Sequence, residues 1–292
     1  MQDRSETNNL SLSLDIDLLR SFVAISEARS LSRAANRVGR TQSALSQQLK
    51  RLEEIVEQPL FQRTGRGVLL TAHGERLLAH AQRILRLHDE AMADLSAKGL
   101  SGTIRFGCPD DYAAVFLPYL LRQFASQHPN VLVEVICAPT PRLLQQWDKH
   151  ALDLALISLP DGAPDESIIR REPLVWVGCP GTETADFDPL PLALSSPDTL
   201  DHLAARASLD RAGRGYRIAY ASDSLAGLTA LVRSGQAIAV ITRTAVPPDL
   251  CILDTTATLP TLPSVGISLK LGHSTPLSEA FAEHTRRSLP LL

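Results

Sequence analysis

The sequence predicts a helical N-terminal unit with a winged helix-turn-helix, then one long helix, then a larger α/β unit built in two lobes. Three observations predict this arrangement. Apolar residues recur at helical spacing through most of the N-terminal third, and a Gly-rich turn between two short apolar runs indicates a β-hairpin near residue 65. From about residue 102 onward, strand-like and helix-like segments alternate to the end, as in an α/β sheet.

The composition is that of a globular protein. Of the 292 residues, 44% are hydrophobic and 21% charged, which is enough to bury a core in about two domains. The polar first nine residues lack the basic start of a secretory signal, and no apolar run approaches the roughly 18 residues that span a bilayer. We therefore expect a cytoplasmic protein with no membrane partner. The cysteines lack paired spacing, which favours free thiols over a metal site: Cys108, Cys137, Cys179 and Cys251.

The net charge of −3 conceals a basic block near the N-terminus. Residues 18–66 hold nine Lys or Arg and four Asp or Glu, whereas the rest of the chain carries a net charge of −8. A positive block within an acidic protein indicates a polyanionic partner for that block. The alternative is a solvated charged surface, which is the more common meaning of a charge run.

Three helices are expected before residue 59. The first covers 17–28, the second 34–38 with Gly39 after its end, and the third begins after Thr41 and stops before Pro59. Two helices joined by a tight turn that contains Gly form a helix-turn-helix. In the third helix an apolar stripe faces inward: Leu45, Leu49, Leu52 and Val56.

The opposite face of the third helix carries uncharged polar side chains near its N-terminus. No acidic residue occurs from Thr41 to Arg51, whereas a plain solvent-facing surface usually mixes Glu with Lys. A Gln side chain can bond adenine through two hydrogen bonds, and Lys can reach guanine or a phosphate. The composition therefore favours DNA over solvent as the partner of this face: Gln42, Ser43, Ser46, Gln47 and Lys50.

A β-hairpin is expected after Pro59, with short apolar runs at Leu60–Phe61 and Val68–Leu70 on either side of a Gly-rich basic turn. Beside a helix-turn-helix such a hairpin is a wing. Its Arg63 and Arg66 would then lie within reach of a phosphate or a minor groove. The turn is not a phosphate-binding glycine loop, because no Lys-Ser/Thr or dinucleotide spacing follows it.

Residues 17–78 closely resemble the N-terminal winged helix-turn-helix of LysR-type transcriptional regulators. The matching pieces follow in order: LLRSFVAISEARSLSRAA, RTQSALSQQLKRLEE and LFQRTGRGVLLTAHGERLL. The resemblance implies a DNA-binding domain over residues 14–70 and double-stranded DNA as its partner. Many members carry Pro or Arg where this chain has Ser43 or Gln47, so the resemblance does not give the preferred base. The residues expected to contact DNA are Ser32, Arg40, Thr41, Gln42, Ser43, Ser46, Gln47, Lys50, Arg63 and Arg66.

Residues 71–98 have the pattern of one long helix with few helix-breaking residues. Its apolar positions alternate three- and four-residue steps, as in the seam of a two-helix coiled coil: Leu78, Ala81, Leu85, His88, Met92 and Leu95. A lone helix exposing this seam would be poorly soluble, so we expect it to pair with a second chain. In the resembled family the linker helix, here 71–100, is a dimer interface, which implies a homodimer or a homotetramer.

Residues 101–292 are expected to form two α/β lobes. This part resembles the effector-binding domain of the LysR family, which has the shape of a periplasmic solute-binding protein. The phrases IRFGCPDDYA and LPYLLRQFASQHPNVLVEV resemble a subgroup of motility and virulence regulators. The expected division is lobe I at 102–177 and 247–292, and lobe II at 178–246, with crossings near Val177–Gly178 and Thr242–Val246.

Polar residues follow several of the predicted strands. In open α/β sheets ligands bind beyond the carboxyl ends of the strands, where hydroxyls and helix N-terminal amides suit a small polar effector. Each residue alone is better explained as a helix cap or a turn, and only their convergence on one cleft favours binding. The expected effector-binding residues are Pro109, Asp110, Asp111, Thr140, Ser158, Ser195, Ser196, Ser222, Asp223, Thr242 and Arg243.

The charge of this cleft predicts the kind of effector. Asp110 and Asp111 follow the first strand, at the start of a helix, where carboxylates are stabilised by the helix dipole. Together they would repel an anionic ligand, and Arg243 at the opposite crossing would offset part of the repulsion. We therefore expect a neutral, zwitterionic or amine-bearing effector rather than a simple acid.

The sequence contains none of the common catalytic signatures, such as G-x-S-x-G, H-E-x-x-H, a P-loop or a Cys–His pattern. We therefore expect a transcriptional regulator that is not an enzyme, has no cofactor or metal, and has RNA polymerase as a further candidate partner. Two alternatives stay open. A solute-binding protein would not explain the basic helix-turn-helix, and an enzyme with an unrecognised site would have to be excluded by a DNA-binding assay.

Overall fold

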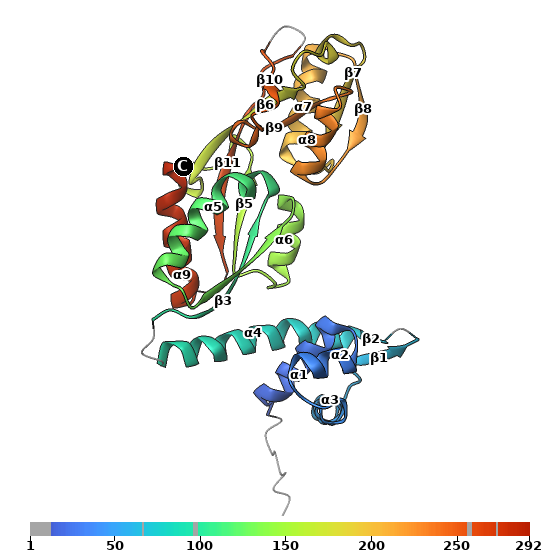
Figure 1. Cartoon of the computed structure of the whole chain (residues 1–292), viewed down its shortest axis with the longest axis vertical. Coiled ribbons are helices and arrows are strands. Elements are labelled where there is room, and N and C mark those ends of the chain that lie inside the picture. Colours follow the sequence, from blue (N-terminus) through green and yellow to red (C-terminus); the bar gives the residue numbers. More distant parts are fainter. Residues whose placement is uncertain (1–12, 66, 96–98, 256–258, 273) are drawn as a thin grey trace, which may run out of the picture. The chain divides into compact units, whose positions relative to one another are not determined.

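The computed structural model describes residues 13–65, 67–95, 99–255, 259–272 and 274–292, which form two compact units (Figure 1). Unit 1 extends to Ser96 and unit 2 begins at Ala97. Each unit has its own buried apolar core, as separate domains do. None of the helices in these ranges is both long and apolar enough to cross a membrane.

Unit 1 begins with three helices: α1 (Ile16–Ala28), α2 (Leu31–Arg37) and α3 (Gln42–Val56). Their N-caps are Asp15, Ser30 and Thr41, whose side-chain oxygens accept hydrogen bonds from backbone amides of the first turn. The predicted helix-turn-helix is confirmed, although α2 begins earlier than expected because Ser30 caps it. The apolar stripes meet in one core, with fully buried side chains at Leu19, Phe22, Ile25, Ala34, Leu45 and Leu52.

The wing is an antiparallel hairpin of β1 (Phe61–Thr64) and β2 (Gly67–Leu70). Its backbone is tied to the end of α1, because the amide of Val68 donates to the carbonyl of Arg29 at 3.1 Å. Arg29 ends α1 in the left-handed conformation, with a φ of 51°. The hairpin is therefore held against the helical core.

The long helix α4 (Ala72–Leu95) packs its apolar face on α1 of the same chain. Ala81 is fully buried, and Leu78 and Leu85 pack against the core of unit 1. These three residues belong to the seam that we expected a second chain to cover. The first half of the seam is instead covered by the chain's own α1, since periodicity cannot tell an internal apolar face from an intermolecular one.

The second half of α4 is more open. The side chains of Leu87 and Met92 are 51% and 60% exposed. The side chain of Leu95 lies outside the described residues. The apolar surface that α4 leaves for a second chain therefore includes Leu87 and Met92.

Unit 2 is built on a nine-stranded sheet. Eight of the strands follow the order β4-β3-β5-β11-β6-β9-β7-β8, and the ninth, the short β10, pairs with β6. Lobe I contains β3 (Gly102–Cys108), α5 (Asp110–Gln127), β4 (Val131–Cys137), α6 (Thr140–Asp148), β5 (Leu154–Leu159) and α9 (Pro276–Ser288). Lobe II contains β7 (Leu190–Leu194), α7 (Leu200–Ala212), β8 (Tyr216–Ala221), α8 (Leu225–Arg233) and β9 (Ile238–Thr242). The middle of the sheet is formed by β6 (Arg170–Gly178) and β11 (Ser264–Leu271). Single 3-10 turns are η1 (Asp165–Ser167), η2 (Thr184–Asp186), η3 (Arg243–Ala245) and η4 (Leu289–Leu291).

Helices cover both faces of this sheet (Figure 1). In β5, Leu154 and Leu156 pack in the core beneath α5 and α9, whereas Ala155 and Ile157 pack in the core beneath α6. In β6 the same alternation separates the cores beneath α7 and α8. Because successive strand side chains point to opposite faces, an unbroken apolar strand is what a doubly covered sheet requires.

The chain crosses from lobe I to lobe II within β6. Residues Arg170–Pro173 pair with β11, whereas Leu174–Val177 pair with β9. The return crossing lies at β11, because Leu250 and later apolar residues still pack in the cores of lobe II. This differs from the return expected at Thr242–Val246. The two-residue strand β10 (Cys251–Ile252) pairs with β6 and keeps the chain in lobe II, but it is too short to be recognised in a sequence.

Gly74→Ala should destabilise unit 1. A Cβ at Gly74, in the first turn of α4, would lie 2.2 Å from the carbonyl oxygen of Leu60, which no side-chain movement can relieve. Overpacking of this kind lowers the free energy of unfolding by about 1–3 kcal/mol. Urea unfolding followed by helical circular dichroism measures it. Gly65→Ala is the matched control, because a Cβ there meets nothing within 4 Å, and equal stability of the two variants would contradict the close contact.

Candidate functional site

The N-terminal end of α3 presents its polar side chains outward. Thr41 caps the helix by accepting from the amide of Ala44 at 3.2 Å, and its hydroxyl lies 3.1 Å from that of Ser43. Leu45 and Leu49 point into the core of unit 1. The remaining predicted residues of this face are Gln42, Gln47 and Lys50, which are exposed, and Ser46, which is half-buried.

A hydrogen bond between two helices positions the first residue of α3. Ser32 of α2 donates from its hydroxyl to Oε1 of Gln42 at 2.8 Å, and both side chains are exposed. The amide nitrogen of Gln42 then remains to donate outward. This donor lies at a helix N-terminus, where free backbone amides also favour an anion such as phosphate.

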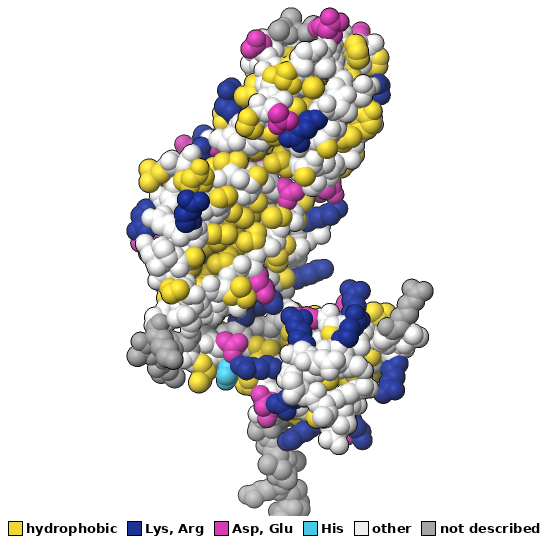
Figure 2. Space-filling model, viewed as in Figure 1, with side chains coloured by type: hydrophobic (Ala, Val, Ile, Leu, Met, Phe, Trp, Pro, Cys, Tyr) yellow, Lys and Arg dark blue, Asp and Glu magenta, His cyan; other side chains and the backbone are white. Residues whose placement is uncertain are grey.

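The predicted basic residues are spread around this face, and Lys and Arg side chains project from several places on unit 1 (Figure 2). Lys50 Nζ is 3.7 Å from Glu54, and Arg40 is 3.6 Å from Asp17. These exposed pairs are weak and can be exchanged for a phosphate. Arg63 is exposed in β1. Arg66 lies outside the described residues.

One exposed basic residue of this face, Arg51, was not predicted from the sequence. It lines a shallow hollow together with Arg40 and Gln47. Its position four residues after Gln47 places it on the same helix face, so this spacing could have identified Arg51 from the sequence.

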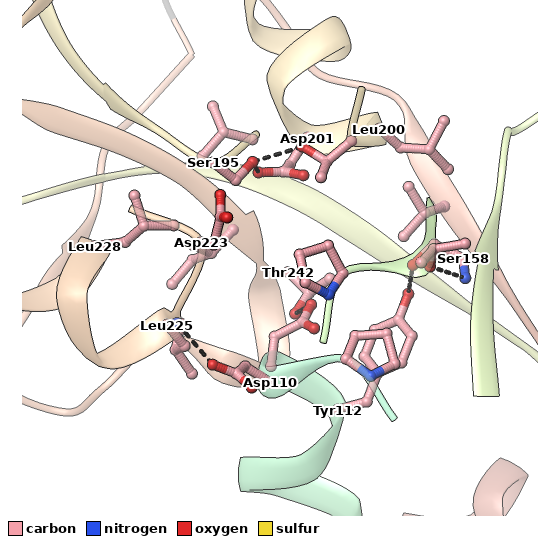
Figure 3. A pocket seen from close by; sticks show the side chains of 18 of the residues that line it. Asp110, Tyr112, Ser158, Ser195, Leu200, Asp201, Asp223, Leu225, Leu228 and Thr242 are labelled. Atoms are coloured by element: carbon pink, nitrogen blue, oxygen red, sulfur yellow. Dashed lines mark hydrogen bonds between the residues drawn. The ribbon is translucent and has the colours of Figure 1, made fainter. Parts of the chain in front are cut away.

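Unit 2 holds a cavity of about 210 Å³ between its lobes (Figure 3). Strand ends of both lobes contribute to the lining, as in other open α/β sheets. Apolar wall residues include Leu200, Leu225, Leu228 and Val240. Eight of the eleven residues expected to bind an effector line this cavity: Pro109, Asp110, Asp111, Thr140, Ser158, Ser195, Asp223 and Thr242.

Three of the expected residues do not line the cavity. Ser196 donates a hydrogen bond to Asp223, which does line the cavity. Ser222 bonds to the backbone of its own loop. Arg243 begins the η3 turn and lines a separate hollow, because the chain turns away at the end of β9.

Hydrogen bonds between strand ends hold the wall that lobe I contributes. The hydroxyls of Tyr112 and Ser158 lie 2.8 Å apart, and the amide of Ser158 donates to Thr140 Oγ1 at 2.9 Å. Tyr112 was not among the expected residues. Its ring is buried in the α5 core while its hydroxyl reaches the cavity wall, so its apolar surroundings conceal it in the sequence.

Three polar contacts join the two lobes beside the cavity. Each pairs a residue of α5 or α6 in lobe I with β9, the β8–α8 connection or the first residue of α8 in lobe II. They are Arg142–Asp223 at 2.9 Å, Asp110 with the backbone amide of Leu225 at 3.3 Å, and Asp111 with the Thr242 hydroxyl at 3.0 Å. The two lobes are therefore joined by polar contacts that a ligand can rearrange.

The cavity is acidic. Among the described residues it is lined by five carboxylates and by no Lys, Arg or His: Asp110, Asp111, Asp198, Asp201 and Asp223. The pKa of Asp111 is raised to about 6, mainly by burial and in part by the charge of Asp201, while hydrogen bonds from the Thr242 hydroxyl and from the backbone amides of Asp111 and Tyr112 offset part of the rise. Burial also raises the pKa of the Cys108 thiol and of the Tyr112 hydroxyl, and in both cases the charge of Asp111 adds to the effect.

Asp198 and Asp201 were not predicted as cavity residues. Asp201 lies in the first turn of α7 and accepts a hydrogen bond from the hydroxyl of Ser195. The sequence feature that could have indicated these two residues is a helix N-terminus directly after a strand end, at Leu194 to Thr199. In the described ranges there is no group of three His, Cys, Asp or Glu side chains that could hold a metal ion.

Comparisons with family models cover both units. Residues 16–75 match the model described as bacterial regulatory helix-turn-helix protein, lysR family. Residues 97–290 match the model of the LysR substrate binding domain. The two matches together cover most of the chain.

Named relatives span the full length of the chain. It is 70% identical over 294 residues to the HTH-type transcriptional regulator DgdR of Burkholderia cepacia, covering 100% of both proteins. It is 32% identical over 265 residues to the HTH-type transcriptional regulator PecT of Dickeya dadantii, covering 89% of this chain and 82% of that one.

Solved structures share the fold at low sequence identity. Full-length CbnR complexed with its target DNA matches 94% of this chain and 100% of its own, with a TM-score of 0.64 and 23% identity. ArgP from Mycobacterium tuberculosis matches 94% of this chain and 97% of its own, with a TM-score of 0.65 and 20% identity.

Asp111→Asn should stabilise unit 2 at neutral pH. The pKa of Asp111 is raised above its ordinary value of 3.8 to about 6, so the ionised carboxylate destabilises the folded state increasingly as the pH rises from about 4 through 6. The gain from the substitution should be small at pH 4 and reach about 1–3 kcal/mol at pH 7, since one pKa unit corresponds to about 1.4 kcal/mol. Urea unfolding followed by tryptophan fluorescence measures it, because Trp147 and Trp176 both lie in unit 2.

The matched control is Asp186→Asn, which removes an exposed carboxylate that does not line the cavity. The stabilisation expected for Asp111→Asn at pH 7 should be absent from this variant. A gain for Asp111→Asn of equal size at both pH values would show that the carboxyl is not buried as described.

Proposed function

The chain is a DNA-binding transcriptional regulator of the LysR family with an effector-binding domain, and we propose that the exposed face of α3 contacts operator bases while the cavity of unit 2 binds the effector. The main support for the first half is the exposed, acid-free polar face at the capped N-terminus of α3. The main support for the second half is the convergence of strand ends from both lobes on one polar cavity.

In the proposed DNA complex, α3 enters the major groove with its N-terminal turn towards the bases. Gln42 is presented by Ser32 with its amide donors outward, and Gln47 follows on the same exposed face. Gln can bond adenine in a bidentate manner. Lys50 and Arg63 are then placed for phosphates, which position the protein without selecting a sequence.

The proposed effector response follows from the contacts between the lobes. A ligand in the cavity that bonds to Asp111 or Asp223 competes with contacts that now join lobe I to lobe II. Binding then shifts the population of lobe arrangements by the difference in ligand affinity between them. The proposed outcome is a change in how two DNA-binding units meet their operator.

The proposed assembly is a homodimer or homotetramer that pairs through the open half of α4. Leu87 and Met92 supply exposed apolar side chains there, and helices bury such residues against a partner. A two-fold dimer matches an operator with two half-sites. Contact with RNA polymerase stays a prediction, as does membership of the motility and virulence subgroup.

We propose binding rather than catalysis as the work of the cavity, because the named relatives are transcriptional regulators. The proposed place of action is the cytoplasm, where a regulator finds its DNA. The free cysteines Cys108, Cys137, Cys179 and Cys251 agree with a reducing compartment.

Gln42→Ala should weaken binding to the operator while leaving binding to unrelated DNA unchanged. The loss should be about 1–3 kcal/mol, because a base-specific hydrogen-bonding pair contributes that much discrimination. Fluorescence anisotropy with the DNA upstream of the protein's own gene measures it, with scrambled DNA in parallel. Gln127→Ala is the control, since Gln127 is exposed at the end of α5 in unit 2. Equal weakening on both DNAs would place Gln42 at a phosphate instead of a base.

The double variant Leu87→Glu with Met92→Glu should lose its dimer. Two buried charges in an apolar interface are strongly destabilising, whereas both side chains are exposed in the single chain, so the fold should be retained. Light scattering coupled to size-exclusion chromatography measures the mass, and circular dichroism checks the fold. Leu291→Glu, at a side chain that is 83% exposed, is the control. A dimer that survives the double variant would remove this half of α4 from the interface.

A further inference from the structure

The cavity of unit 2 holds more negative charge than its own contacts neutralise. Asp223 forms an ion pair with the arginine of α6 at 2.9 Å. Asp110 accepts from a backbone amide at the N-terminus of α8, where the helix dipole favours a carboxylate. Asp198 is exposed to solvent. The carboxylates of Asp111 and Asp201 remain, each in the first turn of its own helix, and in the described part of the chain neither is paired with a Lys, Arg or His side chain.

These two carboxylates come from opposite lobes. Asp111 belongs to the first turn of α5 in lobe I, and Asp201 to the first turn of α7 in lobe II. In the contacts between side chains each accepts from a neutral hydroxyl, that of Thr242 at 3.0 Å for Asp111 and that of Ser195 for Asp201. Figure 3 shows Asp201 beside Ser195 on the side of lobe II, with Asp110 and Tyr112 on the side of lobe I. Like charges that share a site of low polarity repel each other.

We propose that the effector is a small aliphatic amine whose ammonium group lies between Asp111 and Asp201. This inference rests on the proposed role of the cavity as the effector site. An ammonium group has three donors, enough for both carboxylates and one hydroxyl such as that of Ser158. It would replace a repulsion between the lobes by two attractions, so binding favours the lobe arrangement that keeps both carboxylates within reach of the ammonium group.

The rest of the cavity suits the aliphatic part of such a molecule. Leu200, Leu228 and Val240 line it from lobe II, and burial of each additional CH₂ group on them strengthens binding. An acid of the same size would gain the same apolar contacts. It would bring a further negative charge into a cavity that, among the described residues, has no Lys, Arg or His in its lining.

The affinity for an amine should fall in acid. The charged or titratable groups that face Asp111 are Asp110 and Tyr112 of α5, Cys108 of β3 and Asp201 of α7, while β9 contributes the neutral Thr242. The pKa of Asp111 is raised to about 6, whereas an aliphatic ammonium stays protonated to well above neutral pH. Protonation of Asp111 therefore weakens binding below pH 6, by up to about tenfold per pH unit.

The test is calorimetry on the full-length protein with three probes that share a butyl chain: n-butylamine, n-butanol and n-pentanoate. We expect the order amine, then alcohol, then acid, with at least tenfold between the first two at pH 7.5. Asp111→Asn and Asp201→Asn should each lower the affinity for the amine at least tenfold and leave that for the alcohol within about twofold. The control Asp186→Asn should change neither. Repeating the amine titration at pH 5.5 should give weaker binding for the unmodified protein and an unchanged value for Asp111→Asn.

Three other outcomes would each overturn the proposal. Pentanoate binding tighter than butylamine would keep the cavity as an effector site but exclude an amine as its ligand. Amine binding that neither Asp111→Asn nor Asp201→Asn weakens would locate the ammonium group elsewhere. Binding of none of the three probes at 50 mM would overturn both the amine and the effector role of this cavity, while the operator contacts of α3 would stand on their own assay.

Discussion

The carboxyl group of Asp111 is desolvated by the protein around it at the junction of the two lobes, although the residue as a whole is only half-buried, and the arrangement of unit 2 depends on how that charge is accommodated. The group lies at the start of α5, directly after β3, so the chain places it beyond the carboxyl end of that strand. Its side-chain hydrogen bond comes from Thr242 of the opposite lobe, and the backbone amides of Asp111 and Tyr112 also hydrogen-bond to it. A neutral hydroxyl compensates a buried carboxylate only in part. The contact between the lobes therefore carries a residual electrostatic cost that a cation can remove.

In unit 1, helix caps and apolar packing hold the proposed DNA-binding face of α3 in position. Three helix caps and one apolar core hold α3 so that its polar face points outward. The Ser32–Gln42 hydrogen bond then fixes a side chain that would otherwise sample several rotamers. A side chain positioned before binding loses less conformational entropy on contact with a base. The wing, tied to the end of α1, and the first half of α4 complete this rigid unit.

Much of this architecture could be predicted from local patterns. Caps such as Thr41, apolar periodicity and the Gly-rich turn determine helices and hairpins over short distances, and in unit 1 the structure has them close to where expected, apart from the earlier start of α2. Eight expected cavity residues line the cavity because strand ends can be located by the same patterns. Features that depend on long-range packing could not be predicted from these patterns. The seam of α4 is shared between α1 and the open surface, Arg243 is carried away by the turn after β9, and Asp201 enters from a helix whose start gave only a capping signal. These depend on packing between distant segments, which periodicity does not contain.

The central claim is that the desolvated carboxyl group of Asp111 has no cationic partner until a ligand binds. A titration of this carboxyl group tests the claim most directly. Carboxyl ¹³C resonances of aspartate-labelled protein can be followed with pH, with the Asp111 signal assigned by its absence in Asp111→Asn. The account predicts a pKa of about 6 for Asp111 in the free protein and a clear fall of that pKa when n-butylamine is added, since a nearby cation favours the ionised form. A pKa near the ordinary value of 3.8 that n-butylamine leaves unchanged would contradict it.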